Sequence, residues 1–308
     1  MNARTLKRLA VIVAALVVVW LGLGLLRRAR ADTAAGLALP RYQPASVDQA
    51  LIVKGADTLR FERRPGGWAV NGLRADPLLV GELVSALSDT SARTSLATES
   101  AASEKRLGLD RADARTFTLL EAGHRVADLR VGNQGEPYPS VYVRLPGHTR
   151  SYELNGRLAD LVVRGLNFWR DKTIAEVHPD SVQAVEVRRG RERYTLTLSG
   201  GQWRLGGRPA DSTAVADLLD RYRNLVADGF PTAAEDSSLS RWKDDRAIRL
   251  LAAGGRPLLV LGVDSIRTGY FARRQGGVTT YRLEDWNVNQ LVPADSTLLP
   301  KAPKAKKT

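Results

Sequence analysis

The sequence predicts an α+β protein in which an N-terminal transmembrane helix precedes two tandem copies of a mostly antiparallel sheet module, each with one or two packed helices. Two observations predict this arrangement. One is an uninterrupted apolar stretch near the N-terminus, and the other is a set of short blocks that recurs 135 residues further along the chain. Within these blocks, apolar and polar residues alternate as they do in half-buried strands.

Residues 9–26 read LAVIVAALVVVWLGLGLL and carry no charge. A helix of this length spans roughly 27 Å, close to the hydrocarbon thickness of a bilayer. We therefore expect a membrane anchor over 1–31 that contacts lipid through 9–26, followed by a linker over 32–43. A cleaved signal peptide is an alternative, because residues 29–31 (ARA) resemble a cleavage site, and a buried soluble helix is a third.

The charge distribution is typical of a membrane-adjacent chain. Of the formal net charge of +13, residues 1–31 supply +6 and residues 294–308 a net +3, which leaves +4 for 32–293. Basic clusters beside an apolar segment and in a short tail suit a membrane surface. The chain has no cysteine, which excludes disulfides, Cys-ligated metal sites and a lipid-modified N-terminal cysteine.

Matching blocks indicate an internal duplication. Residues 44–47 (PASV) return as residues 179–182 (PDSV), an offset of 135. The same offset relates strand positions, a tryptophan and an aspartate: Ile52/Val187, Leu59/Tyr194, Phe61/Leu196, Trp68/Trp203, Asp76/Asp211 and Leu83/Leu218. The offset then falls in steps to 129, as changes in loop length would produce, and at an offset of 130 it relates Gly132 to Gly262.

Each copy is expected to open with two alternating strands, and a Gly-containing turn then leads to the strand that holds the tryptophan. A helix follows, with Asp76 or Asp211 as its N-cap. Further strands complete the copy, and in the first copy a closing helix is expected around 158–169. The expected modules cover 44–178 and 179–293, before a basic, disordered tail over 294–308.

The tryptophan-to-aspartate spacing, the capped helix, the strand run that ends in Tyr-x-Leu and the apolar N-terminus together resemble the domain-of-unknown-function family DUF4340. The resemblance covers roughly residues 44–293, in two copies. That family is similar to auxiliary envelope components associated with gliding-type ABC transporters. The resemblance therefore implies an exported, transporter-associated protein, and it supplies no catalytic residues.

No enzyme motif stands out in the chain. A nucleophile elbow, a P-loop and a dinucleotide-binding glycine pattern are all missing, and the three histidines lack partners at metal-ligand spacing. We therefore expect no catalytic residue, no metal and no cofactor. An unrecognised hydrolase is the enzymatic alternative, because catalytic residues need not be contiguous in sequence.

The densest basic run outside the two ends consists of Arg188, Arg189, Arg191 and Arg193. The run spans a strand end, a turn and the start of the next strand, which favours a solvated hairpin tip. A contact with a partner protein or with lipid headgroups is the functional alternative. We expect no nucleic acid, because aromatic residues do not alternate with these arginines.

Trp68 and Trp203 occupy equivalent positions in the two copies. We expect each tryptophan to pack the following helix onto its sheet, so that Trp203→Ala would cost about 3–5 kcal/mol of stability. A ligand-binding platform is the alternative role for these side chains.

These observations favour a non-enzymatic, single-pass protein of the inner membrane with its globular part in the periplasm. The leading hypothesis is a scaffold or accessory component of a membrane complex with an envelope protein partner, and the resemblance points to ABC transporter subunits. The alternative is an envelope ligand- or glycan-binding module with a cleft between the two copies.

Overall fold

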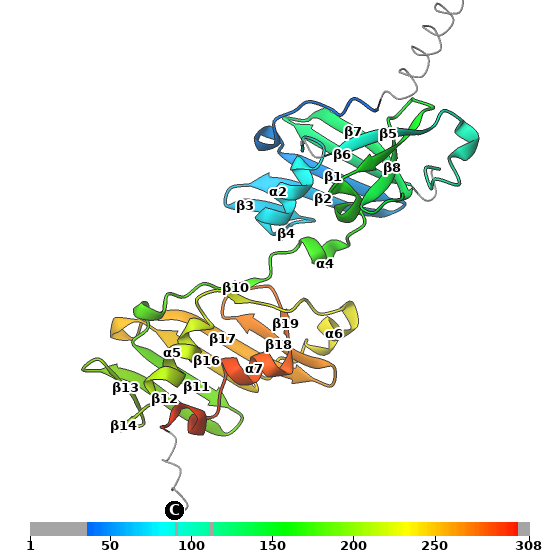
Figure 1. Ribbon diagram of the computed structural model, residues 1–308. Coiled ribbons are helices and arrows are strands. Elements are labelled where there is room, and N and C mark those ends of the chain that lie inside the picture. The colour runs from blue at the N-terminus through cyan, green and yellow to red at the C-terminus, as the bar shows by residue number, and fades with distance from the viewer. Residues whose placement is uncertain (1–35, 90–91, 111–113, 301–308) are drawn as a thin grey trace, which may run out of the picture. The chain divides into compact units, whose positions relative to one another are not determined.

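The computed structural model describes residues 36–89, 92–110 and 114–300. The chain divides between Asp171 and Lys172 into two compact units, which we call the first and second modules (Figure 1). No helix within the described ranges is long and apolar enough to cross a membrane. The expected anchor at 9–26 lies outside the described residues, as does the basic segment 301–308.

The first module is built on a nine-stranded sheet in the order β4-β3-β2-β1-β6-β7-β8-β9-β5. Its strands are β1 Gln49–Lys54, β2 Asp57–Arg64, β3 Gly67–Val70, β4 Leu73–Arg74, β5 Arg93–Thr98, β6 Arg115–Glu121, β7 His124–Gln134, β8 Ser140–Arg144 and β9 Ser151–Asn155. Apart from β5, the strands follow a meander in two halves that meet where β1 pairs with β6.

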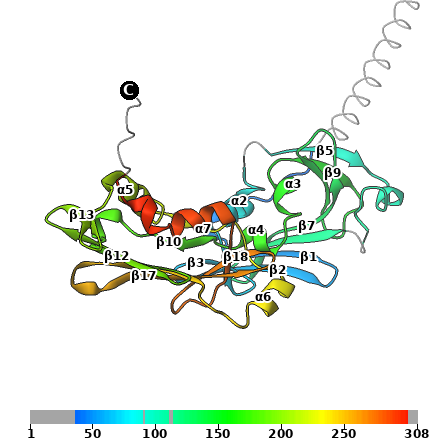
Figure 2. The same ribbon diagram turned by 90° about the horizontal axis from the view of Figure 1, so that it is seen from below.

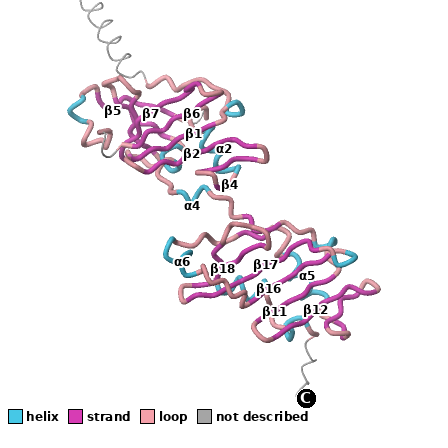
Figure 3. The backbone as a smooth tube through the Cα atoms, turned by 180° about the vertical axis from the view of Figure 1, so that it is seen from behind, coloured by secondary structure: helices cyan, strands magenta, loops and turns pink. Residues whose placement is uncertain are grey.

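The second module repeats this order in an eight-stranded sheet, β14-β13-β12-β11-β16-β17-β18-β19. The strands are β11 Ala184–Arg189, β12 Glu192–Ser199, β13 Gln202–Leu205, β14 Arg208–Pro209, β16 Arg246–Leu251, β17 Pro257–Ile266, β18 Gly269–Arg274 and β19 Tyr281–Leu283. The same strand order in both sheets agrees with the duplication predicted from the matching blocks, and both meanders can be followed in Figure 3.

Alternating burial explains why these segments are strands. Ala50 and Ile52 in β1, and Val185 and Val187 in β11, are buried while the residues between them are not, as period-two alternation requires. A two-residue turn joins β3 to β4 in the first module at Asn71 and Gly72, with φ values of 48° and 81°. Gly206 and Gly207 make the same turn in the second module, at 53° and 86°. Positive φ at both central residues is the hairpin geometry that Asn-Gly and Gly-Gly pairs favour.

An aspartate-capped helix lies on one face of each sheet, which we call the inner face. Helix α2 (Pro77–Ser85) begins after Asp76, whose carboxylate accepts the backbone N–H groups of Leu78 and Leu79 at 2.9 and 3.2 Å. Helix α5 (Ser212–Asp220) begins after Asp211 in the same way, at 3.0 and 3.1 Å. Each carboxylate satisfies N–H groups that the helix itself leaves unpaired. Three apolar side chains of each helix are buried against the sheet: Val80, Leu83 and Val84 in α2, and Val215, Leu218 and Leu219 in α5.

An irregular segment covers part of the opposite, outer face of each sheet. In the first module, residues 99–110 bring Leu107 and Leu109 onto this face, and in the second, α6 (Ala233–Ser238) leads to the buried Leu239. Figure 2 shows α6 on the other side of the second sheet from α5 and α7. Residues 99–110 approach β7 so closely that a Cβ atom on Gly132 would lie 2.2 Å from the carbonyl oxygen of Leu107.

The closing helix expected around 158–169 is interrupted, which corrects the prediction. The structure has α3 (Leu158–Leu161) and α4 (Leu166–Trp169), separated by residues that include Gly165 in an extended conformation. The break allows Trp169 to reach the core, where its ring packs edge-on against Phe61 at 5.0 Å. In the second module a single helix, α7 (Asp285–Leu291), occupies the corresponding place in the chain.

Three predicted boundaries differ from the structure. The modules divide between Asp171 and Lys172 rather than after residue 178, and apolar side chains at the outer end of each module are buried. The expected linker over 32–43 belongs to the first module from residue 36 onwards: Leu37 is buried, and the Tyr42 hydroxyl donates to the carbonyl of Val84 at 2.7 Å. The segment of the second module that corresponds to residues 36–43 includes β10 (Thr173–Ala175), which pairs with β15 (Leu225–Val226).

The expected disordered tail likewise starts too early. Residues Asp295–Leu298 form a 3-10 helix, in which Leu298 is buried and accepts the backbone N–H of Asp211 at 2.9 Å. The second module therefore extends past 293, and only residues 301–308 of the predicted tail lie outside the described residues.

Candidate functional site: the tryptophan pocket of the second module

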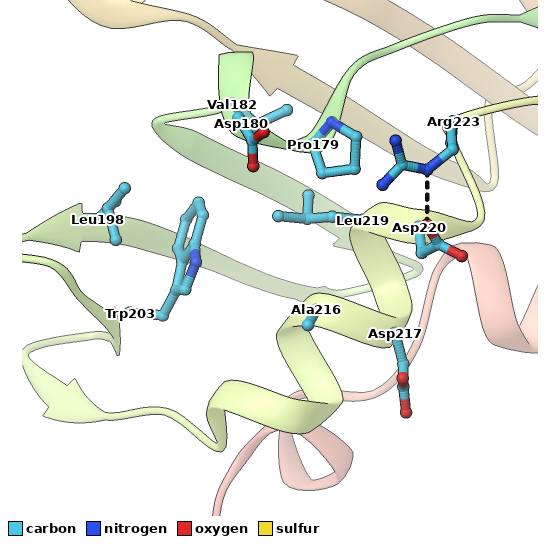
Figure 4. A pocket seen from close by; sticks show the side chains of 10 residues that line it. All are labelled: Pro179, Asp180, Val182, Leu198, Trp203, Ala216, Asp217, Leu219, Asp220 and Arg223. Atoms are coloured by element: carbon cyan, nitrogen blue, oxygen red, sulfur yellow. Dashed lines mark hydrogen bonds and ion pairs between the residues drawn. The ribbon is translucent and has the colours of Figure 1, made fainter.

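An open cavity with apolar walls lies beside Trp203 on β13 in the second module. Trp203 is partly exposed and faces a cavity of about 500 Å³ at the inner face of the sheet, beside α5 (Figure 4). The apolar walls consist of Pro179, Val182, Leu198, Ala216 and Leu219. A cavity of this size lies within the range of protein sites that hold small molecules or side chains.

The tryptophan of the first module is covered instead. Trp68 is 8% exposed, and the guanidinium of Arg63 lies over its ring at 4.8 Å from the centroid. The same arginine donates from Nε to the carbonyl oxygen of Val47 at 3.2 Å. Arg63 is directly opposite Trp68 across the β2–β3 pair, whereas the residue opposite Trp203 across β12–β13 is Leu198. A shorter, uncharged side chain at this one position leaves the ring of Trp203 accessible.

A second difference between the modules lies at the end of the capped helix. In the first module, Tyr42 lies over the end of α2, where its hydroxyl donates to the carbonyl of Val84. Burial raises the pKa of Tyr42, so the hydroxyl remains a donor at neutral pH. The equivalent residue at an offset of 135 is Val177, which is buried and has no hydroxyl to make this contact with α5.

Acidic side chains line the rim of the Trp203 pocket. Asp180, Asp217 and Asp220 line it, and Arg223 is the one basic residue among them. Arg223 donates to Asp220 at 2.8 Å, which leaves Asp180 and Asp217 to set the sign of the local potential. Residues 32–293 carry a net charge of +4, so the negative rim is a local reversal of charge. The pocket therefore suits an apolar group that is flanked by positive charge.

The four arginines of the basic run do not form one patch. Arg188 and Arg193 are paired across the β11–β12 hairpin on the outer face, and Arg191 is exposed at its tip. Arg189 points to the inner face, as adjacent strand residues must, and donates to Asn289 Oδ1 at 3.1 Å. Arg188 also lies 3.7 Å from Asp244. The hairpin thus divides the run between two faces, with part of its charge paired internally.

Trp203 packs against the core of the second module, as the sequence predicts, but its ring is also partly exposed. Trp68 and Trp203 do lie in equivalent places, and Asp76 and Asp211 cap equivalent helices. Packing is close to complete only around Trp68, so the core role expected for both tryptophans fits the first module better. The missed residue was Leu198, and the signal that could have revealed it was the change from Arg63 at the same offset.

The described residues contain no group of three or more histidine, aspartate or glutamate side chains placed to hold a metal ion. His178 lies 3.4 Å from Asp180 at the rim of the Trp203 pocket and is mostly exposed. The arrangement around Trp203 is suited to holding an apolar and positively charged group by burial, ring contact and charge attraction.

Fold and site together define a tandem α+β repeat protein, with two meandering antiparallel sheets and an accessible apolar pocket in the second copy. The chain belongs to the family DUF4340, described as a domain of unknown function, whose model matches residues 41–242. This match confirms the family that the tryptophan and aspartate spacing predicted. Neither a curated protein nor a solved structure matches the chain.

Proposed function

We propose that this protein is a non-enzymatic accessory component of a membrane complex in the cell envelope, and that its second module docks a partner protein in the Trp203 pocket. The proposal includes an inner-membrane anchor at 9–26 and modules that lie in the periplasm. ABC transporter subunits are the first partners to test, because the resemblance described above implies a transporter-associated protein.

The observation that carries the proposal is the accessible ring of Trp203 opposite Leu198, where the first module covers its own tryptophan with Arg63. Large aromatic side chains in a concave setting are the commonest anchors of protein interfaces, because they bury much area at little cost in conformational entropy. The duplicated fold has a ready means of covering this ring, and the second copy lacks it.

The rim identifies the chemistry of the partner. Asp180 and Asp217 favour a segment that places an apolar side chain against Trp203 and has lysine or arginine beside it. An anchor in the same membrane as the partner raises the local concentration, so that a pocket of modest affinity suffices for stable association.

A site-specific photo-crosslinker tests the proposal in cells. We would place it at Asp217, on the pocket rim, and at Glu82, the equivalent exposed position on α2. We expect crosslinks from position 217 alone, to a membrane-complex subunit, and mass spectrometry should identify a peptide with an apolar residue next to lysine or arginine. Equal crosslinks from both positions, or a crosslinked peptide without basic residues, would contradict the docking role.

The matched variant Leu198→Arg introduces the side chain that covers Trp68 in the first module. We expect the crosslinks from position 217 to disappear in this variant, while the thermal stability of the protein stays unchanged. A crosslink from position 217 to the chain's own lysines at 301–307 would instead assign the pocket to the C-terminus and overturn the partner proposal. Protease access to a C-terminal tag in spheroplasts, together with carbonate extraction, tests the anchor and the periplasmic location.

A further inference from the structure

A second cavity, in the first module, combines apolar walls with unpaired positive charge. It has a volume of about 360 Å³ and lies between the inner face of β1 and β2 and the segment that joins α3 to α4. Ile52, Leu59 and Leu166 form its apolar walls, and Lys54, Arg115 and Arg164 supply three cations against the single acid Asp57. Val163 at the wall is 40% exposed, so the cavity opens to solvent.

The second module fills the equivalent place with its own atoms. Tyr194, which replaces Leu59, occupies the apolar space and donates to the carbonyl oxygen of Pro293 at 2.6 Å. Arg189 and Arg246 stand where the first module has Lys54 and Arg115. Both arginines donate to one oxygen, Oδ1 of Asn289 on α7, at 3.1 and 3.0 Å.

The first module has the two neighbouring cations, Lys54 and Arg115, but has no internal acceptor like Asn289 between them. Asp160 corresponds to Asn289 at an offset of 129, but its carboxylate binds Arg157 and the hydroxyl of Tyr138 instead. Within the described ranges, Lys54, Arg115 and Arg164 make no ion pair. The apolar part is open as well, because leucine at position 59 is shorter than tyrosine.

We infer that the cavity of the first module binds a single-chain anionic amphiphile. Its carboxylate or phosphate oxygens take the place that Asn289 Oδ1 has in the second module, between Lys54 and Arg115, with Arg164 at the entrance. Its hydrocarbon chain lies on Ile52, Leu59 and Leu166, where the second module has the Tyr194 ring. Charge-assisted hydrogen bonds to the headgroup and burial of the chain both contribute to affinity. This inference does not depend on the proposed docking function.

Calorimetric titration of the full-length protein in zwitterionic phosphatidylcholine nanodiscs tests the inference, with the heat of empty nanodiscs subtracted. The probes are dodecyl phosphate and dodecanoate, each below its critical micelle concentration, and the comparison compounds are dodecanol and inorganic phosphate. We expect saturable binding of one or both anionic amphiphiles, and binding at least about tenfold weaker for dodecanol and for inorganic phosphate. Binding of dodecyl phosphate alone would point to a phospholipid-type source, and binding of dodecanoate alone to a free fatty acid.

Two variants locate the site. Leu59→Tyr brings in the side chain that fills the second module, and Arg115→Gln removes one headgroup cation. Each should weaken binding at least about tenfold, whereas Arg256→Gln, the same charge change at an exposed turn of the second module, should not. Circular dichroism spectra check that each variant is folded. Equal binding by all the variants, or equal binding of dodecanol, would show partition into the bilayer and overturn the inference.

Discussion

The two modules have the same strand order but leave different parts of their inner faces open. The first module covers Trp68 with Arg63 and leaves a basic, apolar cavity beside Leu59. The second module fills that place with Tyr194 and leaves the ring of Trp203 accessible. A duplicated fold can thus present two chemically opposite pockets, because a few side-chain exchanges decide whether each place is filled.

The tryptophans give the largest expected difference. Trp68→Ala should lower the free energy of unfolding by about 3–5 kcal/mol, as for a buried aromatic side chain, and Trp203→Ala by about 1–2 kcal/mol because its ring is already partly exposed. Guanidinium unfolding of both variants measures this difference. Equal losses would mean that Trp203 is packed as tightly as Trp68, and would remove the basis for the docking site.

The tyrosine that fills the second module should have the next largest effect. Tyr194→Leu, which introduces the residue of the first module, removes the hydrogen bond to Pro293 and leaves a void, so we expect a loss of about 2 kcal/mol. Tyr194→Phe keeps the ring and should cost about 1 kcal/mol. Urea unfolding distinguishes them; a fully neutral Tyr194→Leu would show that the side chain fills nothing.

The helix caps should show where the modules behave alike. Asp76→Ala and Asp211→Ala each remove an acceptor for two backbone N–H groups at similar distances, and each should cost about 1 kcal/mol. Because the caps belong to separate modules, the double variant should lose the sum of the two effects. A marked inequality in thermal unfolding would break the equivalence of α2 and α5.

The smallest effect concerns acid stability. In each module a glutamate of the outer-face segment pairs with a sheet arginine, as Glu104 with Arg144 and Glu235 with Arg282. The hydrogen bond from Arg144 lowers the pKa of Glu104, and the backbone N–H of Thr232 is the main cause of the lowered pKa of Glu235. A lowered folded-state pKa stabilises the fold above the ordinary carboxyl pKa, and this contribution is lost as the pH falls through the folded value.

Glu104→Gln and Glu235→Gln should therefore reduce stability at neutral pH and flatten the decline below about pH 4. Melting temperatures between pH 3 and pH 7 measure this flattening. An unchanged acid slope in both variants would show that the glutamates do not hold the outer-face segments in place.

Features that depend on neighbouring residues were predictable from the sequence. Strands β1 and β11 follow from period-two alternation, and the caps at Asp76 and Asp211 from residue type and position. The division of the helix around Gly165 was not predictable, because it depends on how Trp169 packs against Phe61. The burial of Leu37 and Leu298 was missed for the same reason, since the side chains they contact are far away in the sequence.

The Trp203 pocket could not be predicted without knowing the strand register. Whether Trp203 is covered depends on which residue of β12 lies directly opposite it, and a shift of one residue would replace Leu198 with a side chain of the other face. The sequence does contain the exchange of Arg63 for Leu198, but only paired strands show that this exchange uncovers a ring.

The close approach at Gly132 and Gly262 has a consequence for recognising relatives of this chain. A Cβ atom on Gly132 would lie 2.2 Å from the backbone carbonyl oxygen of Leu107, so this position excludes every other residue unless the covering segment moves. A Cβ atom on Gly262 would lie 2.0 Å from the side-chain Oδ1 of Asp244, which can rotate aside. A sequence search profile should therefore weight the glycine heavily in the first half, and a homologue that lacks it there is expected to have rebuilt the outer face of its first module.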